Sequence, residues 1–265
     1  MNRLDQRFCD LKKKNDKAGV FFITAGDPDI TTTFDVMLAM AQNGADVIEL
    51  GMPFSDPMAE GPVIQRASAR ALKNNITLKD IFELVSRFRK QSDTPVVMMG
   101  YCNPVFQYGL ETFVRDAGYH GVDGFIIADM PYEEGENLEA ICRKNEMSLI
   151  YLLAPDFFPR RTEEILNASS GFVYVVSQYS TTGTETQHHV SPDTLTALRS
   201  KTMLPVCVGF GISSADKARH YCGYADGVII GSWLIKEMET ADDKAAAAGE
   251  LVRSVKNVIR NNGNL

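Results

Sequence analysis

The chain has few cysteines, and none of them stands in a metal-binding pattern. Their number is odd and no pair has CxxC spacing; they are Cys9, Cys102, Cys142, Cys207 and Cys222. This pattern argues against a disulfide framework and against a zinc knuckle. We therefore expect a reducing, cytoplasmic environment for the protein.

Basic charge is also scarce. Lys and Arg total 27 against 34 Asp and Glu, the net charge is −7, and the longest basic run is Lys12 to Lys14. This balance argues against nucleic acid or an anionic membrane as a partner, and the lysine run is typical of a solvated helix face. No run approaches the ~18 apolar residues of a membrane span, and residues 1–16 contain no apolar leader core. We expect neither a membrane span nor a cleaved leader.

The chain does contain eight short apolar runs, which alternate with segments of helical length. The runs cover residues 20–26, 46–52, 95–101, 124–130, 149–154, 172–177, 205–211 and 227–232. Their nearly continuous apolar character is typical of parallel strands that are buried on both faces. The predicted helices cover residues 30–44, 78–91, 107–117, 133–145, 159–168, 191–200, 213–222 and 244–260, with Thr77 and Ser191 as capping residues.

Eight strand-then-helix units without a linker predict an α/β fold: a closed (β/α)₈ or TIM barrel. The length of 265 residues suits one such domain over residues 1–265, since a barrel of this kind needs about 250 residues. The amphipathic N-terminal segment predicts an extra helix before the first strand. An open doubly wound sheet is the competing topology, but the turn from Ala25 to Pro28 lacks its GxGxxG motif.

In a barrel, the chemistry lies at the carboxyl ends of the strands. Glu49 stands inside the apolar second run, and none of the first five runs contains a basic residue to pair with it. Burial disfavours the charged carboxylate, which makes Glu49 a candidate general acid or base near neutral pH. Glu60 follows in the next loop and is the second candidate. Asp56 in that loop either caps a turn or has a partner or positioning role, and the sequence leaves both possibilities open.

The last strand ends are rich in glycine. VGFGISS (208–214) and IIGSW follow the seventh and eighth runs, and Ser180 to Gly183 follow the sixth. Glycines before a helix let backbone N–H groups approach an anion, so we predict a phosphate site there. His188 and His189 lie in a long polar stretch without partners at ligand spacing, and we expect no metal.

These motifs together resemble one family. ITAGDPD (23–29), IELGMPFSDPMAEGP (48–62), IADMP (127–131), TTG (181–183), GFGISS (209–214) and IIGS (229–232) occur in an order similar to that of the tryptophan synthase α subunit. The resemblance covers essentially the whole chain, and the PFSDPxAxGP element is highly specific. It implies a cytoplasmic lyase without a cofactor of its own, which cleaves indole-3-glycerol phosphate to indole and glyceraldehyde 3-phosphate. It also implies a β-subunit partner in an α₂β₂ complex, which contains pyridoxal phosphate and receives the indole through a tunnel.

The resemblance also implies roles for individual residues. Glu49 is the catalytic acid/base at indole C3 and the glycerol hydroxyl, and Glu60 is the second catalytic carboxylate, at the indole N–H. The other assignments are substrate binding by Phe22, Ile64, Tyr101, Tyr174 and Thr182, phosphate binding by Gly183, Phe210, Gly211, Gly231 and Ser232, and a partner interface at Pro53, Asp56, Asn103, Phe106, Asp129 and Pro131.

The sequence departs from the family at two important places. Glu60 stands where the family usually has aspartate, and residues 178–183 read QYSTTG where the family has a sequence close to RSGVTG. These departures motivate an alternative, a weak or silent α subunit that activates its β partner. Another sugar-phosphate barrel enzyme is a third possibility, which the PFSDPMAEGP element disfavours.

Overall fold

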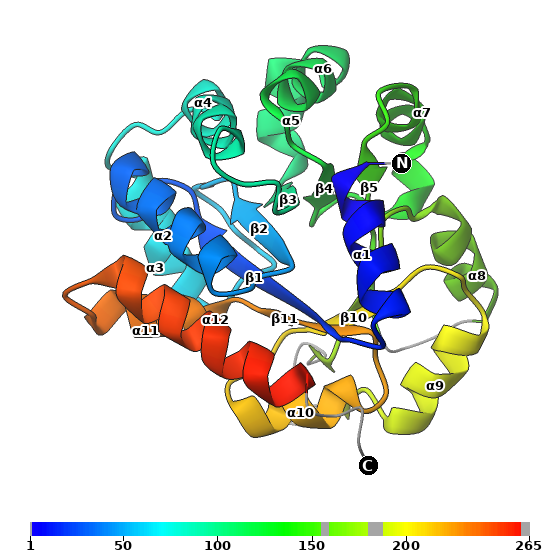
Figure 1. Ribbon diagram of the computed structural model, residues 1–265. Helices are drawn as coiled ribbons and strands as arrows, with labels where there is room; N and C mark the ends of the chain where they lie inside the picture. The colour runs from blue at the N-terminus through cyan, green and yellow to red at the C-terminus, as the bar shows by residue number, and fades with distance from the viewer. Residues whose placement is uncertain (1, 155–158, 180–187, 261–265) are drawn as a thin grey trace.

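The predicted closed barrel is confirmed. The computed structural model describes residues 2–154, 159–179 and 188–260, and Figure 1 shows strands at the centre with helices around them. The parallel strands follow the order β5-β4-β3-β2-β1-β11-β10-β7-β6. They are β1 (Ala18–Thr24), β2 (Val47–Gly51), β3 (Val96–Gly100), β4 (Gly124–Ile127), β5 (Ser148–Leu149), β6 (Leu152–Leu153), β7 (Val173–Val176), β10 (Val206–Gly209) and β11 (Gly227–Ile230).

One extended segment closes the barrel. β5 pairs with β4, whereas β6, only two residues further along the chain, pairs with β7. The two edges of the sheet are therefore consecutive parts of the predicted fifth strand. Most strands are buried along their whole length, which explains their nearly continuous apolar sequences.

The helices begin and end largely where capping residues predict. Thr77 forms a capping box with Asp80 at the start of α4, and the Ser191 side chain accepts a bond from the Thr194 N–H at the start of α9. The helices are α1 (Arg3–Lys13), α2 (Ile30–Gln42), α3 (Pro62–Leu72), α4 (Leu78–Arg89), α5 (Cys102–Tyr108), α6 (Leu110–His120), the 3₁₀ turn η1 (Tyr132–Glu134), α7 (Glu136–Lys144), α8 (Pro159–Ala168), α9 (Pro192–Ser200), α10 (Ala215–Cys222), α11 (Ser232–Thr240) and α12 (Lys244–Arg260). None of the described helices combines the length and apolar character of a membrane span.

Several boundaries differ from the prediction. The predicted helix 107–117 is two helices, because Gly109 has a φ of 89° and interrupts the helical backbone. The fourth strand was predicted to reach residue 130 but ends at Ile127, because the Met130 N–H donates a hydrogen bond to the Ile127 carbonyl and forms a turn. Two helices, α3 and α11, were not predicted, and they contact each other near the end of β1.

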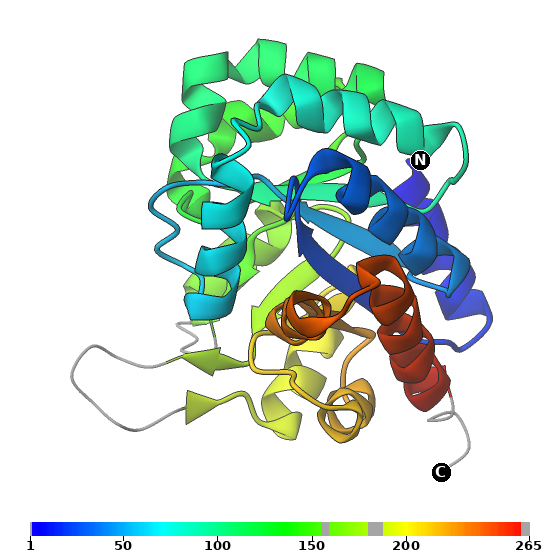
Figure 2. The same cartoon turned by 90° about the vertical axis from the view of Figure 1, so that its left-hand side faces the viewer.

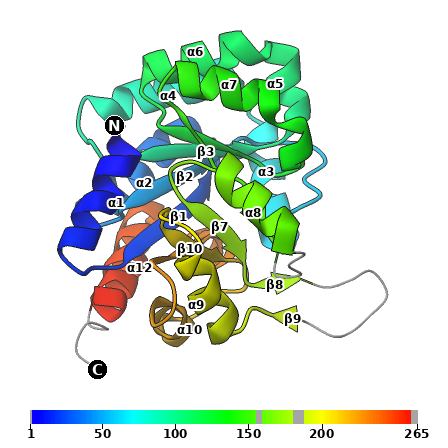
Figure 3. The ribbon, with the colours of Figure 1, turned by 90° about the vertical axis from the view of Figure 1, so that its right-hand side faces the viewer.

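A short hairpin also corrects the sequence analysis. His188 and His189 were expected in a loop, but they form strand β9 and pair antiparallel with β8 (Gln178–Tyr179). Figure 3 shows this two-stranded unit projecting from the barrel. The antiparallel pairing aligns Gln178 with His189 and Tyr179 with His188.

The amino ends of the strands form a stabilising layer. Helix α1 covers this end: Phe8 packs on Phe172, and Arg3 pairs with Asp123. Helix α12 packs beside α2, as the red and blue helices of Figure 2 show. Three aspartates that each precede a strand accept an N–H of the neighbouring strand and pair with a basic side chain: Asp46 with Gly19 and Lys256, Asp123 with Val96 and Arg89, and Asp226 with Val206 and Arg199. This end is therefore built for stability, and the opposite end is left for chemistry.

Candidate active site

The two predicted pocket residues on β1 and β2 are neighbours inside the barrel. Phe22 pairs in register with Glu49. Gly19 and Phe21 face outward, because a side chain added at Gly19 would strike Phe21 and Lys256 of α12. Since side chains alternate along a strand, Phe22 faces the interior, and so does its partner Glu49. The structure thus brings these two residues together in the barrel interior.

Glu49 is a buried acid without a counterion among the described residues. Its side chain is 1% exposed, and Oε2 has no hydrogen-bond partner in the described part of the chain. Burial, followed by the charge of Glu60, raises the pKa of Glu49 to about 8. The carboxyl group therefore holds its proton at neutral pH and can give it to a substrate.

Glu60 occupies a different environment at the mouth of the barrel. Tyr101, the residue before α5, donates its phenol hydrogen bond to Glu60 Oε2, and the Ala59 N–H donates to the same phenol oxygen at 2.9 Å. Burial raises the pKa of Glu60, the bond from Tyr101 opposes that rise, and the nearby Asp129 charge adds to it. One carboxyl group lacks a donor and the other has one, so the pair can divide acid and charge-stabilising roles.

Aromatic rings line the space around the carboxyl groups. Tyr174 on β7 is buried, lies 5.9 Å from the Phe210 ring between centroids, and has its pKa raised by burial and by the charges of Glu49 and Glu60. A side chain at Gly51 would come within 2.5 Å of the Phe22 ring, so any larger residue there would displace that ring. Ile64, on the unpredicted α3, packs at the edge of the core.

The predicted phosphate residues meet at the ends of β10 and β11. Phe210 and Gly211 both have positive φ, 67° and 72°, which turns the chain sharply after β10. Gly231 begins α11 without a side-chain cap, and Ser232 follows in the first turn. Uncapped N–H groups at a helix N-terminus are suited to an anion. Thr182 and Gly183 lie outside the described residues.

The predicted interface residues share the rim around this mouth. Asp56, Asn103, Asp129 and Pro131 are exposed, and Pro53 is half-buried. Phe106 is 55% exposed and Met58, in the Glu60 loop, is 83% exposed. Asp129 also accepts a hydrogen bond from the Cys102 N–H at 2.7 Å, so it links the rim to the N-terminus of α5. Large exposed apolar side chains at one rim are typical of a protein interface.

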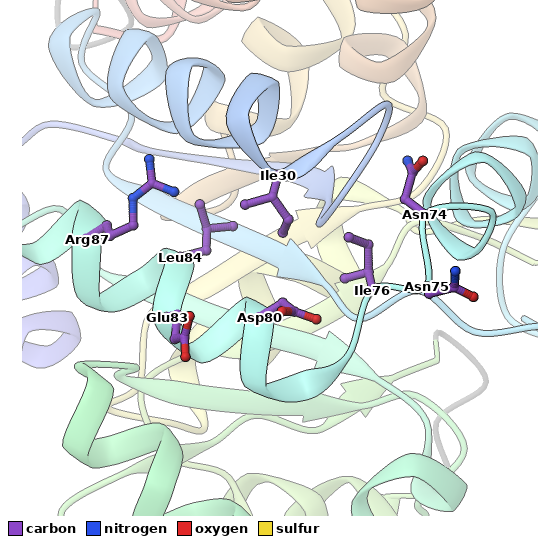
Figure 4. Close-up of a pocket in the computed structure, with 8 residues that line it drawn as sticks. All are labelled: Ile30, Asn74, Asn75, Ile76, Asp80, Glu83, Leu84 and Arg87. Carbon is purple, nitrogen blue, oxygen red and sulfur yellow. The ribbon is translucent and has the colours of Figure 1, made fainter.

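One surface pocket outside the barrel lacks comparable chemistry. A pocket of about 360 Å³ lies between α2 and α4, outside the barrel (Figure 4). Two of its polar residues have structural partners: Asp80 caps α4, and Arg87 lies 4.5 Å from the centroid of the Phe34 ring. Over the described ranges, no group of three or more His, Cys, Asp or Glu side chains is arranged to hold a metal.

Two features of the site were not predicted from sequence. The bond between Tyr101 and Glu60 joins residues 41 positions apart, and no local motif signals it. Thr24, at the end of β1, has a buried hydroxyl without a partner among the described residues. The pairing register of β1 with β2 is needed to recognise that this hydroxyl lies beside the Glu49 strand.

A TIM barrel with two carboxyl groups, an aromatic wall and a phosphate-type helix terminus at its mouth belongs to the class of phosphate-binding barrel enzymes. Comparison with known proteins identifies one family within this class. The family model for the tryptophan synthase alpha chain matches residues 8–261. The tryptophan synthase alpha chain of Geotalea uraniireducens is 44% identical over 260 residues, 97% of each chain. The crystal structure of tryptophan synthase subunit alpha from Legionella pneumophila str. Paris has a TM-score of 0.88 and 38% identity, covering 98% of this chain and 99% of that chain.

The chain belongs to the tryptophan synthase alpha chain family. It is therefore a lyase of tryptophan biosynthesis, which cleaves indole-3-glycerol phosphate to indole and glyceraldehyde 3-phosphate. This assignment fits the lyase interpretation of the sequence rather than the silent alternative.

Proposed function

We propose that Glu49 and Glu60 divide the proton and charge work of this cleavage. Glu49 begins protonated and gives its proton to indole C3, the carbon that carries the glycerol chain. Positive charge then spreads to the indole nitrogen, where the Glu60 carboxylate accepts a hydrogen bond from the indole N–H and stabilises the charge. The Glu49 carboxylate next takes the proton of the adjacent glycerol hydroxyl. The bond between C3 and the glycerol carbon breaks, its electrons return to the ring, and Glu49 is again protonated.

The remaining pocket residues hold the two ends of the substrate. We assign Phe22, Tyr174 and Ile64 to the indole ring, because apolar and aromatic side chains bury such rings well. Phe210, Gly211, Gly231 and Ser232 take the phosphate, with Thr182 and Gly183 expected to complete the site. Tyr101 acts on the substrate through Glu60, which it orients.

We further propose a β-subunit partner at the rim. The exposed Phe106 and Met58 supply apolar contact, and Asp56, Asn103 and Asp129 supply polar contact. A neighbour in fold, titled tryptophan synthase from M. tuberculosis in its aminoacrylate-bound form, has a TM-score of 0.88 and 29% identity, covering 98% of this chain and 100% of that chain. By analogy, we propose an α₂β₂ complex in the cytoplasm, with pyridoxal phosphate in the β subunit and no cofactor in this chain.

The observation that carries the proposed roles is the contrast between an unpaired, buried Glu49 and a hydrogen-bonded Glu60. The test is a coupled assay of glyceraldehyde 3-phosphate release, with the chain alone and with its cognate β subunit. Glu49→Gln should reduce release by roughly 1000-fold, because the amide cannot donate and recover a proton. Glu250→Gln, an exposed change on α12, is the matched control. Release by Glu49→Gln at the unmodified rate would refute the assignment, and stimulation of the β subunit without any release by the unmodified chain would establish the silent alternative.

A further inference from the structure

The hydroxyl of Thr24 is a polar group that the proposed roles leave unused. Thr24 is the last residue of β1 and is 3% exposed. It pairs in register with Gly51, two positions beyond the pair of Phe22 and Glu49. Because side chains two positions apart share a face, Thr24 faces the barrel interior with Phe22, one step nearer the mouth.

Unpaired buried polar atoms are few in the described part of the chain. They are Thr24 Oγ1, Glu49 Oε2 and His120 Nδ1. Two of these three, Thr24 Oγ1 and Glu49 Oε2, lie on adjacent strands and face the barrel interior. A buried hydroxyl without a partner destabilises the fold, and such groups are rare in native proteins. The pairing of two of them in one pocket points to a ligand that satisfies both.

Three other buried hydroxyls among the described residues do have partners. Thr33 on α2 donates to the Asp29 carbonyl and accepts the Gly26 N–H, and Thr94 before β3 accepts a bond from Ser92 at 3.0 Å. Ser177, after β7, donates to the Phe210 carbonyl. The unpaired state of Thr24 is therefore a local property of the pocket.

The strand order places Thr24 between the two ends of the substrate. β1 lies between β2, which carries Glu49, and β11, which leads into Gly231 and Ser232. A glycerol chain that joins an indole ring near Glu49 to a phosphate near α11 must pass the end of β1. The Thr24 hydroxyl, at the end of β1, can therefore form a hydrogen bond with a hydroxyl group of the glycerol part of the substrate.

We propose that Thr24 binds the glycerol hydroxyl that Glu49 deprotonates, donating its own O–H to that oxygen; this inference rests on the proposed function. When Glu49 removes the proton, negative charge develops on the oxygen, and the Thr24 hydroxyl stabilises it. The same bond orients the hydroxyl toward Glu49. Substrate thus satisfies both unpaired groups at once.

The test replaces the hydroxyl with a methyl group of the same size. Thr24→Val should lower kcat/KM for indole-3-glycerol phosphate by roughly 10- to 100-fold, while Thr24→Ser, which keeps the hydroxyl, should stay within about threefold of the unmodified enzyme. Binding of 3-(indol-3-yl)propyl phosphate, which lacks both glycerol hydroxyls, should be the same for all three proteins.

Thermal unfolding supplies a second readout. Thr24→Val should unfold at an equal or higher temperature, because it removes an unpaired buried polar atom, whereas the control Thr94→Val should unfold at a lower temperature and cleave normally. Cleavage by Thr24→Val at the unmodified rate would overturn the proposal for Thr24 alone. Weakened binding of the propyl phosphate would also overturn it, since the loss would then not involve a hydroxyl. An unmodified chain that cleaves no substrate would instead refute the proposed function.

Discussion

Tyr101 and Glu60 are joined by a hydrogen bond at the mouth of the barrel, and they come from the segments that follow two adjacent strands, β3 and β2. The Tyr101 ring also stacks on Phe54, with 5.1 Å between centroids, and its oxygen accepts the Ala59 N–H. The stacking contact therefore holds the Tyr101 ring, and the Ala59 N–H holds its phenol oxygen. The Glu60 carboxylate is therefore held in one orientation before substrate arrives, which is the preorganisation that charge stabilisation requires.

Removing the phenol oxygen tests this orientation. We expect Tyr101→Phe to lower kcat for indole-3-glycerol phosphate cleavage by roughly tenfold, since Glu60 loses the bond that positions it. Its KM should change little. Tyr108→Phe is the matched control, because Tyr108 lies at the other end of α5 and donates its hydroxyl hydrogen bond to Asp116 of α6 at 2.9 Å. Equal kcat values for the two variants would contradict a positioning role for Tyr101.

A second prediction concerns the length of the Glu60 side chain. Glu60→Asp restores the residue usual in the family but withdraws the carboxylate by about 1.3 Å from Tyr101, and displacements near 1 Å can cost up to about a hundredfold in rate. We expect kcat to fall at least about fivefold, because the loop and Tyr101 are arranged around glutamate. Steady-state kinetics of cleavage provide the measurement. A faster Glu60→Asp enzyme would mean that the loop adapts and that aspartate is the better acid here.

Much of the barrel follows from local sequence. Eight apolar runs predict the strands, and the cap at Thr77 predicts the start of α4, because these signals act between near neighbours. Helix α3 was missed although Pro62 stands at its first turn, a known start signal. The split at Gly109 was missed because the apolar pattern continues through it.

The site was predictable only in part, for a related reason. Glu49 violates the apolar pattern of its strand, and such a violation is visible in the sequence. Thr24 violates nothing: threonine is an ordinary strand residue, and its unpaired state depends on the register with β2. The Tyr101 bond likewise depends on how two loops meet in space, which no periodicity encodes.

The amino end of the barrel should control stability and not activity. Lys256 is 1% exposed, and its ammonium group pairs with the buried Asp46 carboxylate and donates to the Lys17 carbonyl. Lys256→Met removes the buried ammonium group from Asp46 and leaves this carboxylate with the Gly19 N–H and the partly exposed Arg7 at 4.0 Å. We expect a loss of about 3–5 kcal/mol in the free energy of unfolding. Urea unfolding measures it, with the exposed Lys236→Met as control. A loss similar to that of the control would show that water replaces the ammonium group.

The pH dependence of cleavage reports the protonation of both acids. Glu49 must begin protonated, so kcat/KM should fall as pH rises through about 8, the pKa to which burial raises it. Glu60 must begin ionised, so kcat/KM should also fall at acidic pH, below a pKa that is raised from its ordinary value of 4.5. In Tyr101→Phe the acidic limb should move to higher pH, because the lost bond had lowered that pKa. A rate that keeps increasing above pH 8 would show that ionised Glu49 is the reactive form.

The raised pKa of Glu49 also predicts a stability that changes with pH. In the unfolded chain this carboxyl group ionises near 4.5, whereas in the fold it ionises near 8. Below pH 4.5 both states are protonated and burial of Glu49 costs nothing extra. Between the two values the unfolded state alone is ionised, so stability falls by up to ~1.4 kcal/mol per pH unit, or roughly 3 kcal/mol by pH 7.

Glu49→Gln removes this ionisation from both states. Its advantage in the free energy of unfolding over the unmodified chain should therefore grow from about pH 5 to about pH 8 and level off above that. Urea unfolding of both proteins across this range gives the difference directly, and Glu250→Gln should show none of the trend. A difference independent of pH would mean that Glu49 ionises at the same pH in both states. In that case the buried acid could not hold its proton at neutral pH, and its role as the donor to indole C3 would fail with it.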